Sequence, residues 1–358
     1  MLLLAAKVGI LASMSGQLSA NENATWQGLR NSIGTLTRNG ASVGPAAFIS
    51  ANGYAVANTS VVEKGVTDLV TSTGLTYKIR VEAKDPASQL TLLKTTIQPA
   101  GITFVRPADR SDGEKGNILV VLPRQVLRAE LTIREKIGVD QQTKRTYPIQ
   151  EVRVEQPALQ MGGALLFSQN GRLIGSLFAA LAQESQSNAQ VGLGNLDKAA
   201  GTVTKKIPLE TSQFGLNSRN YGPQGLVVGY TPTWEVTSKA VNGFLTPGKK
   251  AQYGVLGVFV FDNRFGGVEI QSIKPNSSAE QAGLEPGDVI LDISGVMIQN
   301  QIDFSRATYR MIPGTTIILK VRRKIEILTV MVTVGSEAEQ FRASQQSSIG
   351  QSFSLGTR

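Results

Sequence analysis

The segment QPALQMGGALLFSQNGRLIGSLFAA, residues Gln156–Ala180, decides the fold that we predict for this chain. It holds two apolar runs, Ala164–Phe167 and Leu173–Ala180, separated by the turn signal Gln-Asn-Gly. Apolar runs on either side of a glycine-containing turn are typical of a β-hairpin. The pair Gly162–Gly163 directly before the first run indicates a sharply bent or closely approached backbone. From these residues alone, the glycine pair is also explained as a tight turn that leads into a core hairpin.

Composition favours a mostly β protein with more than one domain. The chain has 358 residues, of which 41% are hydrophobic and 37 are glycine. That length is enough for two or three domains with their own cores. Many glycines and few apolar runs at helical spacing favour strands joined by turns.

Two residue types are absent, and their absence limits the chemistry. The sequence contains no histidine and no cysteine. A Ser-His-Asp triad, a Cys-His pair, a disulfide framework and the usual zinc and haem ligands are therefore excluded. We expect no cofactor and no metal.

Net charge alone does not indicate a nucleic-acid partner. The chain carries 36 Lys and Arg against 27 Asp and Glu, a formal charge of +9. The basic residues are scattered, with the densest run at Arg322–Lys324, and no aromatic residues alternate with a basic stripe. A nucleic-acid groove needs that combination, so we predict a solvated basic surface and no nucleic-acid binding.

The N-terminal residues leave the compartment open. Met1–Met14 is apolar except for Lys7, and Leu18–Ala20 could end a signal peptide. However, no positive charge precedes the apolar run, which is also too short to span a bilayer. An exported protein with an imperfect leader and a chain with a flexible N-terminal arm both stay possible, and no transmembrane segment is expected.

Short β-type segments follow one another along the first two thirds of the chain. A first set starts with Val43–Ser50 and Tyr54–Asn58, and a second set includes Leu127–Ile137 and the hairpin quoted above. This spacing fits two consecutive six-stranded barrels, although strand number alone does not distinguish a barrel from a sandwich.

Three motifs resemble the HtrA (Deg) family of trypsin-like serine proteases. Leu159–Leu165 is similar to the family's G-N-S-G-G-A-L, Gly44–Val62 to G-x-G-F-I-I-S-x-x-G-Y-I-L-T-N-x-H-V-V, and Asp85–Lys94 to D-x-x-x-D-L-A-L-L-K. The resemblance implies a trypsin-like double β-barrel. It also implies a homo-oligomer, specifically a trimer. The leader-like N-terminal residues favour an extracytoplasmic location, periplasmic or secreted, and a cytoplasmic or organellar one stays open.

The same motifs place Ser60, Gln89 and Met161 where the family has its catalytic His, Asp and Ser. Loss of the nucleophile or base of a triad costs about 10⁶-fold in rate, or roughly 8 kcal/mol. We therefore expect no enzyme but a catalytically inactive pseudoprotease. A residual serine hydrolase with a rerouted nucleophile such as Ser60 is the first alternative, and a structural subunit of a larger complex is the second.

The C-terminal third resembles a PDZ domain of the HtrA arrangement. Tyr253–Val258 is similar to the family's R-G-Y-L-G-V loop, and Ser277–Ile290 to S-P-A-x-x-A-G-L-x-x-G-D-V-I. The resemblance implies capture of a peptide C-terminus or an exposed β segment by a glycine loop, a strand edge and a helix over Ile302–Met311. The predicted peptide-binding residues are Val255, Leu256, Gly257, Val258, Phe259, Val260, Ile302, Arg306 and Tyr309.

These inferences divide the chain into five parts. We predict an N-terminal arm or leader (1–23), a double-barrel domain (24–232) with an inserted segment (183–224), a linker helix (233–251), a PDZ domain (252–335) and a flexible tail (336–358). The predicted function is polypeptide binding through the PDZ domain, as a scaffold, adaptor or chaperone-like module for protein quality control. The predicted partner is a polypeptide ligand or partner protein.

Overall fold

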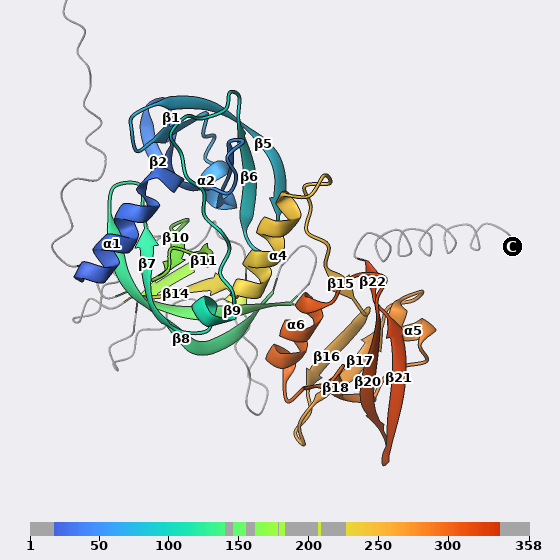
Figure 1. Ribbon diagram of the computed structural model, residues 1–358. Coiled ribbons are helices and arrows are strands. Elements are labelled where there is room, and N and C mark those ends of the chain that lie inside the picture. The colour runs from blue at the N-terminus through green and yellow to red at the C-terminus, as the bar shows by residue number, and fades with distance from the viewer. Residues whose placement is uncertain are drawn as a thin grey trace, which may run out of the picture. The chain divides into compact units, whose positions relative to one another are not determined.

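The computed structural model describes residues 18–139, 146–154, 162–177, 179–182, 207–208 and 227–336. The chain divides into two compact units, residues 1–251 and 252–358 (Figure 1). The second unit begins at Gln252, where the sequence predicts the start of the PDZ domain. None of the described helices is both long enough and apolar enough to cross a membrane.

The first half of the first unit is a closed barrel, as expected for a trypsin-like fold. Its strand order is β1-β2-β3-β6-β5-β4. Large apolar side chains such as Leu36, Phe48 and Leu69 fill the barrel and are fully buried. The strands are β1 (Ile33–Arg38), β2 (Ala41–Phe48), β3 (Tyr54–Asn58), β4 (Asp68–Thr71), β5 (Thr76–Asp85) and β6 (Leu90–Thr95).

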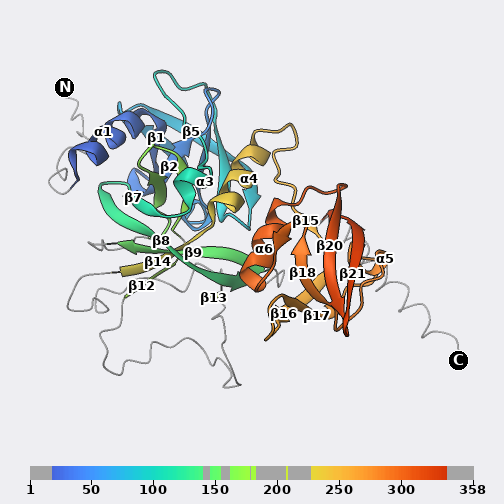
Figure 2. The same cartoon turned by 60° about the horizontal axis from the view of Figure 1, so that its bottom comes forward.

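The second half of this trypsin-like domain is a sheet of eight described strands, whereas the sequence spacing predicts six. The order is β11-β10-β7-β8-β9-β14-β12, and β13 pairs with β8; Figure 2 shows β8, β9 and β14 side by side. The strands are β7 (Gly116–Val121), β8 (Val126–Val139), β9 (Thr146–Val154), β10 (Leu165–Ser168), β11 (Leu173–Ser176), β12 (Ala179–Ala182), β13 (Ile207–Pro208) and β14 (Val227–Pro232).

The predicted strand Leu173–Ala180 is two strands, and the break curls this sheet. Strand β11 pairs with β10 at one end of the sheet, whereas β12 pairs with β14 at the other. Three residues of chain reach at most roughly 10 Å, so the two ends of the sheet must lie close together. The close approach of Gly175 in β11 to Thr231 in β14 agrees, because a Cβ at Gly175 would lie 2.4 Å from the Thr231 hydroxyl oxygen.

Four helices and one short 3₁₀ turn complete the described part of the first unit. The turn η2 (Arg30–Ser32) follows α1 directly. Helix α4 lies within the predicted linker helix (233–251). Its N-cap residue is Thr233, although the Thr233 side chain makes no capping hydrogen bond. The predicted domain boundary at residue 23 falls inside α1. The helices are α1 (Ala20–Leu29), α2 (Thr59–Val62), α3 (Arg110–Gly113) and α4 (Trp234–Phe244).

One buried cluster joins both halves of the first unit. It combines Leu92 of the closed barrel with Phe167 of the second sheet, Trp26 of α1 and Phe244 of α4. Burial of a large apolar side chain contributes about 1.5–3 kcal/mol, so these shared contacts hold the two halves and both helices as one body.

The described part of the second unit contains two β sheets and two helices. The main sheet has the order β16-β17-β18-β20-β21, with β19 paired to β18, and a separate two-stranded sheet joins β15 and β22. Its elements are β15 (Gly254–Val255), β16 (Val258–Asp262), β17 (Val268–Ile273), α5 (Ser278–Gln281), β18 (Val289–Ile293), β19 (Val296–Met297), α6 (Gln301–Arg310), β20 (Thr316–Arg323), β21 (Glu326–Thr333) and β22 (Gly335–Ser336).

Helix α1 is anchored by a buried carboxylate. Ser19 and Glu22 form a capping box at its start, and Glu22 also pairs with Arg128 of β8 at 3.1 Å. Burial raises the pKa of Glu22, but the bonds to Ser19 and the charge of Arg128 outweigh this effect and leave the pKa below its usual value. The charged form of Glu22 is thus favoured in the folded state, and its contribution to stability is lost as the pH falls through that lowered pKa.

We predict that Glu22→Gln lowers the free energy of unfolding at neutral pH by about 1–3 kcal/mol, the usual cost of breaking a buried charge-assisted hydrogen bond. Urea unfolding followed by fluorescence of Trp26, on the same helix, measures this change. The matched control is Glu63→Gln, because Glu63 is exposed and pairs with Lys84 at 3.0 Å. Such a surface pair is worth less than about 1 kcal/mol, and equal losses in the two variants would refute the anchoring role.

Candidate functional site

The position expected for the catalytic base is held by a buried polar network. Strand β3 ends at Asn58, which is fully buried and caps α2. The Asn58 side-chain oxygen accepts hydrogen bonds from the Ser60 backbone N–H (2.9 Å) and hydroxyl (2.6 Å). The Asn58 amide nitrogen donates to the Ser176 hydroxyl at 2.9 Å. One asparagine thereby fixes Ser60 and ties β3 to β11.

Gln89 and Gly163 lie near Ser60. The backbone carbonyl of Gln89 accepts from the Thr59 N–H at 2.9 Å, next to Ser60. Gln89 has a left-handed backbone (φ 57°), and its side-chain amide donates to the Pro86 carbonyl at 2.8 Å. Met161 lies outside the described residues. Gly163, two residues later, has φ 88°, and a Cβ there would lie 3.8 Å from the Ser60 hydroxyl oxygen.

This arrangement orients a serine hydroxyl without a conventional base. Nucleophilic serines are activated by a nearby imidazole, amine or carboxylate. The described hydrogen-bond acceptor of the Ser60 hydroxyl is the Asn58 amide oxygen, which does not take up a proton at neutral pH. Since the sequence has no histidine, any peptide-bond chemistry in this unit proceeds without an imidazole.

Sequence reasoning missed Asn58 and Ser176 as members of this site. Both are fully buried polar residues in otherwise apolar strands. A polar residue inside an apolar strand needs a hydrogen-bonding partner when it is buried, and that requirement was the available signal. The partner itself lies 118 residues away in the chain, so the sequence alone does not identify it. No group of three or more His, Asp, Glu or Cys residues suited to a metal occurs within the described ranges.

In the second unit, hydrogen bonds to two successive carbonyls orient the glycine loop. The Leu256 carbonyl accepts from the Ala279 N–H (2.9 Å), and the Gly257 carbonyl accepts from the Lys274 N–H (2.8 Å). In a trans peptide, the C=O and the following N–H point in opposite directions. The N–H groups of Gly257 and Val258 therefore point away from Ala279 and Lys274. Gly257 makes this turn with φ 82°, a conformation that favours glycine.

Strand β16 and helix α6 lie beside this loop. Strand β16 is an end strand of the main sheet and pairs with β17. An end strand carries N–H and C=O groups along its outer edge. Figure 1 shows α6 next to β16, and the Gln301 N–H donates to the Asp262 carboxylate at 2.6 Å, which joins the start of α6 to the end of β16.

The predicted peptide-binding residues are not equally placed. Ile302 and Arg306 are half-buried on α6, four residues apart and therefore on one face. Tyr309 is buried, with its ring packed edge-on against Tyr253 at 5.3 Å between ring centres, so it supports the loop from inside. Leu256 is also buried, whereas Phe259 is exposed. The remaining four, Val255, Gly257, Val258 and Val260, are half-buried.

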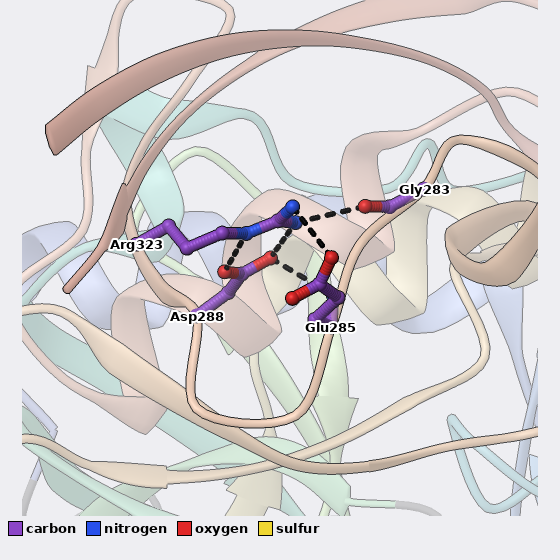
Figure 3. A network of polar contacts seen from close by, with 4 residues as sticks. All are labelled: Gly283, Glu285, Asp288 and Arg323. Atoms are coloured by element: carbon purple, nitrogen blue, oxygen red, sulfur yellow. Dashed lines mark hydrogen bonds and ion pairs between the residues drawn. The ribbon is translucent and has the colours of Figure 1, made fainter.

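A charged network fixes the loop after α5 (Figure 3). The Arg323 guanidinium donates to both carboxylate oxygens of Asp288 (2.8 Å each), to Glu285 (2.7 Å) and to the Gly283 carbonyl (2.8 Å). Burial raises the pKa of Asp288, but the Arg323 hydrogen bonds and the Glu285 N–H outweigh burial and leave that pKa below its usual value. The network holds α5, whose Ala279 N–H binds the Leu256 carbonyl of the glycine loop.

Comparison with known proteins agrees with this geometry. A family model described as a PDZ domain matches residues 254–334. The periplasmic serine endoprotease DegP of Salmonella typhimurium is 24% identical over 288 residues, which cover 78% of this chain and 54% of that protein. A probable periplasmic DegP-like serine endoprotease of Chlamydia trachomatis is 23% identical over 297 residues, covering 81% and 53%. The chain thus spans about half the length of these curated relatives.

Solved structures share the fold. The HtrA-type protease AlgW, in a structure with a decapeptide, matches with a TM-score of 0.59 and 15% identity, covering 89% of this chain and 99% of that one. A serine endoprotease from Yersinia pestis matches with a TM-score of 0.54 and 16% identity, over 89% and 99% of the two chains.

These findings define the class as a mostly β, trypsin-like HtrA fold followed by a C-terminal PDZ domain. The PDZ domain, the DegP relatives and the HtrA structures together support membership of the HtrA/Deg family.

The prediction that the chain is not an enzyme is contradicted by the same comparisons. The curated relatives are named serine endoproteases, and the matched structures are named proteases or endoproteases. The error came from treating three replaced positions as decisive, although one of them, Met161, lies outside the described residues. The similarity to these proteins points to the protease family.

We predict that Asn58→Ala and Ser176→Ala are energetically coupled. Each removes one end of a buried hydrogen bond, with an expected loss of about 1–3 kcal/mol in the free energy of unfolding. The double variant should lose less than the sum of the single variants, with a coupling energy of about 0.5–3 kcal/mol. Urea unfolding of all four proteins measures it, and strict additivity would show that the contact does not tie β3 to β11.

We predict that Asp288→Asn destabilises the PDZ unit in a pH-dependent way. At neutral pH the loss should be about 1–3 kcal/mol, because the variant breaks charge-assisted hydrogen bonds to Arg323. Asp288 has a lowered folded pKa, so its carboxylate stabilises the fold above the unfolded value of about 3.9, and this contribution disappears at lower pH. The difference between wild type and variant in urea unfolding should shrink below about pH 4. A difference that stays constant down to that range would contradict the role of the charge.

Proposed function

We propose that the PDZ unit binds a polypeptide by its free C-terminus or by an exposed β segment. The observation that carries the proposal is the direction of the Gly257 and Val258 N–H groups, whose neighbouring carbonyls are committed to Ala279 and Lys274. Converging backbone N–H groups bind a terminal carboxylate without a charged side chain. An extended ligand would then pair with the outer edge of β16.

The residues predicted from the sequence take different roles in this proposal. Val255, Leu256, Gly257 and Val258 form the carboxylate loop, and Phe259 and Val260 offer backbone groups to the ligand strand. Ile302 and Arg306 face the ligand from α6, with Ile302 providing apolar contact and Arg306 a positive charge. Tyr309 positions the loop through Tyr253 and does not contact the ligand, since its ring is buried.

We further propose that the whole protein holds polypeptide segments as a scaffold, adaptor or chaperone-like module of protein quality control. The named function of its relatives supports polypeptides as its partners, because DegP and AlgW are described as proteases and the AlgW structure contains a decapeptide. We also propose an extracytoplasmic location, which the periplasmic designation of the DegP relatives supports. A homotrimer is proposed from the family resemblance.

The test is peptide binding by the full chain, measured by fluorescence anisotropy with a library of labelled C-terminal peptides. We expect binders among the peptides with a free carboxylate and at least about tenfold weaker binding after C-terminal amidation, since a charge-assisted hydrogen bond is worth about 1.5–3 kcal/mol. Equal binding of amidated peptides would favour internal β segments over chain ends.

Two variants locate the binding surface. Ile302→Asp should weaken peptide binding by about tenfold or more, because it places a carboxylate beside an apolar contact. Met331→Asp is the matched control, because Met331 is exposed on β21, at the opposite end of the main sheet from β16. Equal affinities for wild type and Ile302→Asp, or no binder in the library, would refute the proposal.

A further inference from the structure

The β20–β21 hairpin presents one apolar and basic face that the peptide site does not use. Directly opposite residues of an antiparallel pair share a face of the sheet. The members of this outer hairpin face form three cross-strand pairs: Ile318 with Met331, Lys320 with Thr329, and Arg322 with Ile327. The alternate residues Leu319, Val321 and Val332 are fully buried in the PDZ core, so the outer hairpin face lies on the side of the sheet away from that core.

The apolar side chains of the outer hairpin face are exposed to solvent. Met331 is 71% exposed, Ile327 58% and Ile318 47%. The two-residue turn between the strands consists of Lys324 and Ile325, and Ile325 is 94% exposed. Adjacent exposed apolar side chains on one surface mark interaction sites, whereas scattered single ones do not.

Positive charge accompanies the apolar side chains. Lys320 and Arg322 alternate with Ile318 along β20, and Lys324 precedes Ile325 at the turn. Arg323 is engaged on the opposite face with Asp288, and Glu326, which is paired with Arg323 in the register, shares that opposite face. Two carboxylates share this side of the sheet. Asp292 lies opposite Lys320 and accepts a hydrogen bond from the Gly295 N–H at 2.8 Å. Glu269 is paired with Val289, the residue opposite Arg322, and Arg322 itself donates to the Asn263 side-chain oxygen at 3.3 Å.

We propose that the outer hairpin face and its Lys324–Ile325 turn dock on an anionic phospholipid surface. Aliphatic side chains would enter the boundary between headgroups and acyl chains, while the lysine and arginine stems extend to the lipid phosphates. Each Lys or Arg near an anionic bilayer contributes about a fivefold gain in affinity, corresponding to about 1 kcal/mol. Ile325 would enter deepest because it projects from the end of the hairpin.

Charge favours a lipid surface over a second copy of this chain. The chain carries a net charge of +9, so two basic hairpin faces would repel each other. An anionic bilayer complements both features of the face at once, since it offers negative charge above an apolar layer. This inference is independent of peptide capture, because β21 lies at the other end of the sheet from β16.

The test is co-sedimentation of the full chain with vesicles of phosphatidylglycerol and phosphatidylcholine in equal parts, and with pure phosphatidylcholine vesicles. We expect binding to the anionic vesicles alone, weakened by added salt, because salt screens exposed charges. Lys320→Glu and Ile325→Asp should each weaken binding by about tenfold. Circular dichroism melts verify folding, and the milder pair Ile325→Ser and Met331→Ser replaces any variant that melts early.

The matched control is Lys115→Glu. Lys115 is exposed in the first unit, and its substitution changes the net charge by the same amount as Lys320→Glu. It should bind anionic vesicles within about twofold of wild type, because it changes the net charge without altering the outer hairpin face. A wild type that does not bind, or equal weakening by Lys115→Glu and Lys320→Glu, would overturn the proposal. A dimer seen by light scattering and abolished by Ile325→Asp would also overturn it, since a second copy would then occupy the face.

Discussion

The first unit depends on one shared apolar cluster, in which side chains from both β halves and two helices are buried together. Phe167 from the quoted hairpin packs in the same cluster as Leu92 of the closed barrel. Helices α1 and α4 enter it through Trp26 and Phe244. Because apolar burial is not directional, the contacts determine that the halves join, whereas hydrogen bonds such as that between Asn58 and Ser176 determine how they are aligned.

In the second unit too, apolar packing and hydrogen bonds have separate roles. Apolar packing builds the sheet, but two carbonyl hydrogen bonds orient the glycine loop, one from α5 and one from the residue after β17. Helix α5 is held in turn by the Arg323–Asp288 ion pair at the end of β20. The direction of two N–H groups in the loop thus depends on a charged contact that no ligand would touch.

The segments around Ser60 are brought together by main-chain contacts. Backbone bonds from Gln89 and the close approach of Gly163 bring their segments to Ser60 although no imidazole is present. Such contacts use main-chain atoms and the small size of glycine, so they are insensitive to the side chains that would react. The similar proteins are nevertheless named proteases or endoproteases. Their names contradict the prediction, made from three side chains alone, that the chain is not an enzyme.

The sequence by itself determined the mostly β class, the PDZ domain, the bounds of α6 to within one residue and the exclusion of histidine chemistry. The class and the exclusion depend on composition, whereas the PDZ domain and its helix were expected from the resemblance of Tyr253–Val258 and Ser277–Ile290 to the family's motifs. The tertiary structure alone decided that Leu173–Ala180 divides between the two ends of one sheet, that Tyr309 is buried against Tyr253, and that Asn58 meets Ser176. These outcomes depend on contacts between residues far apart in the chain, and local sequence patterns carry no information about which distant partner a buried group will meet.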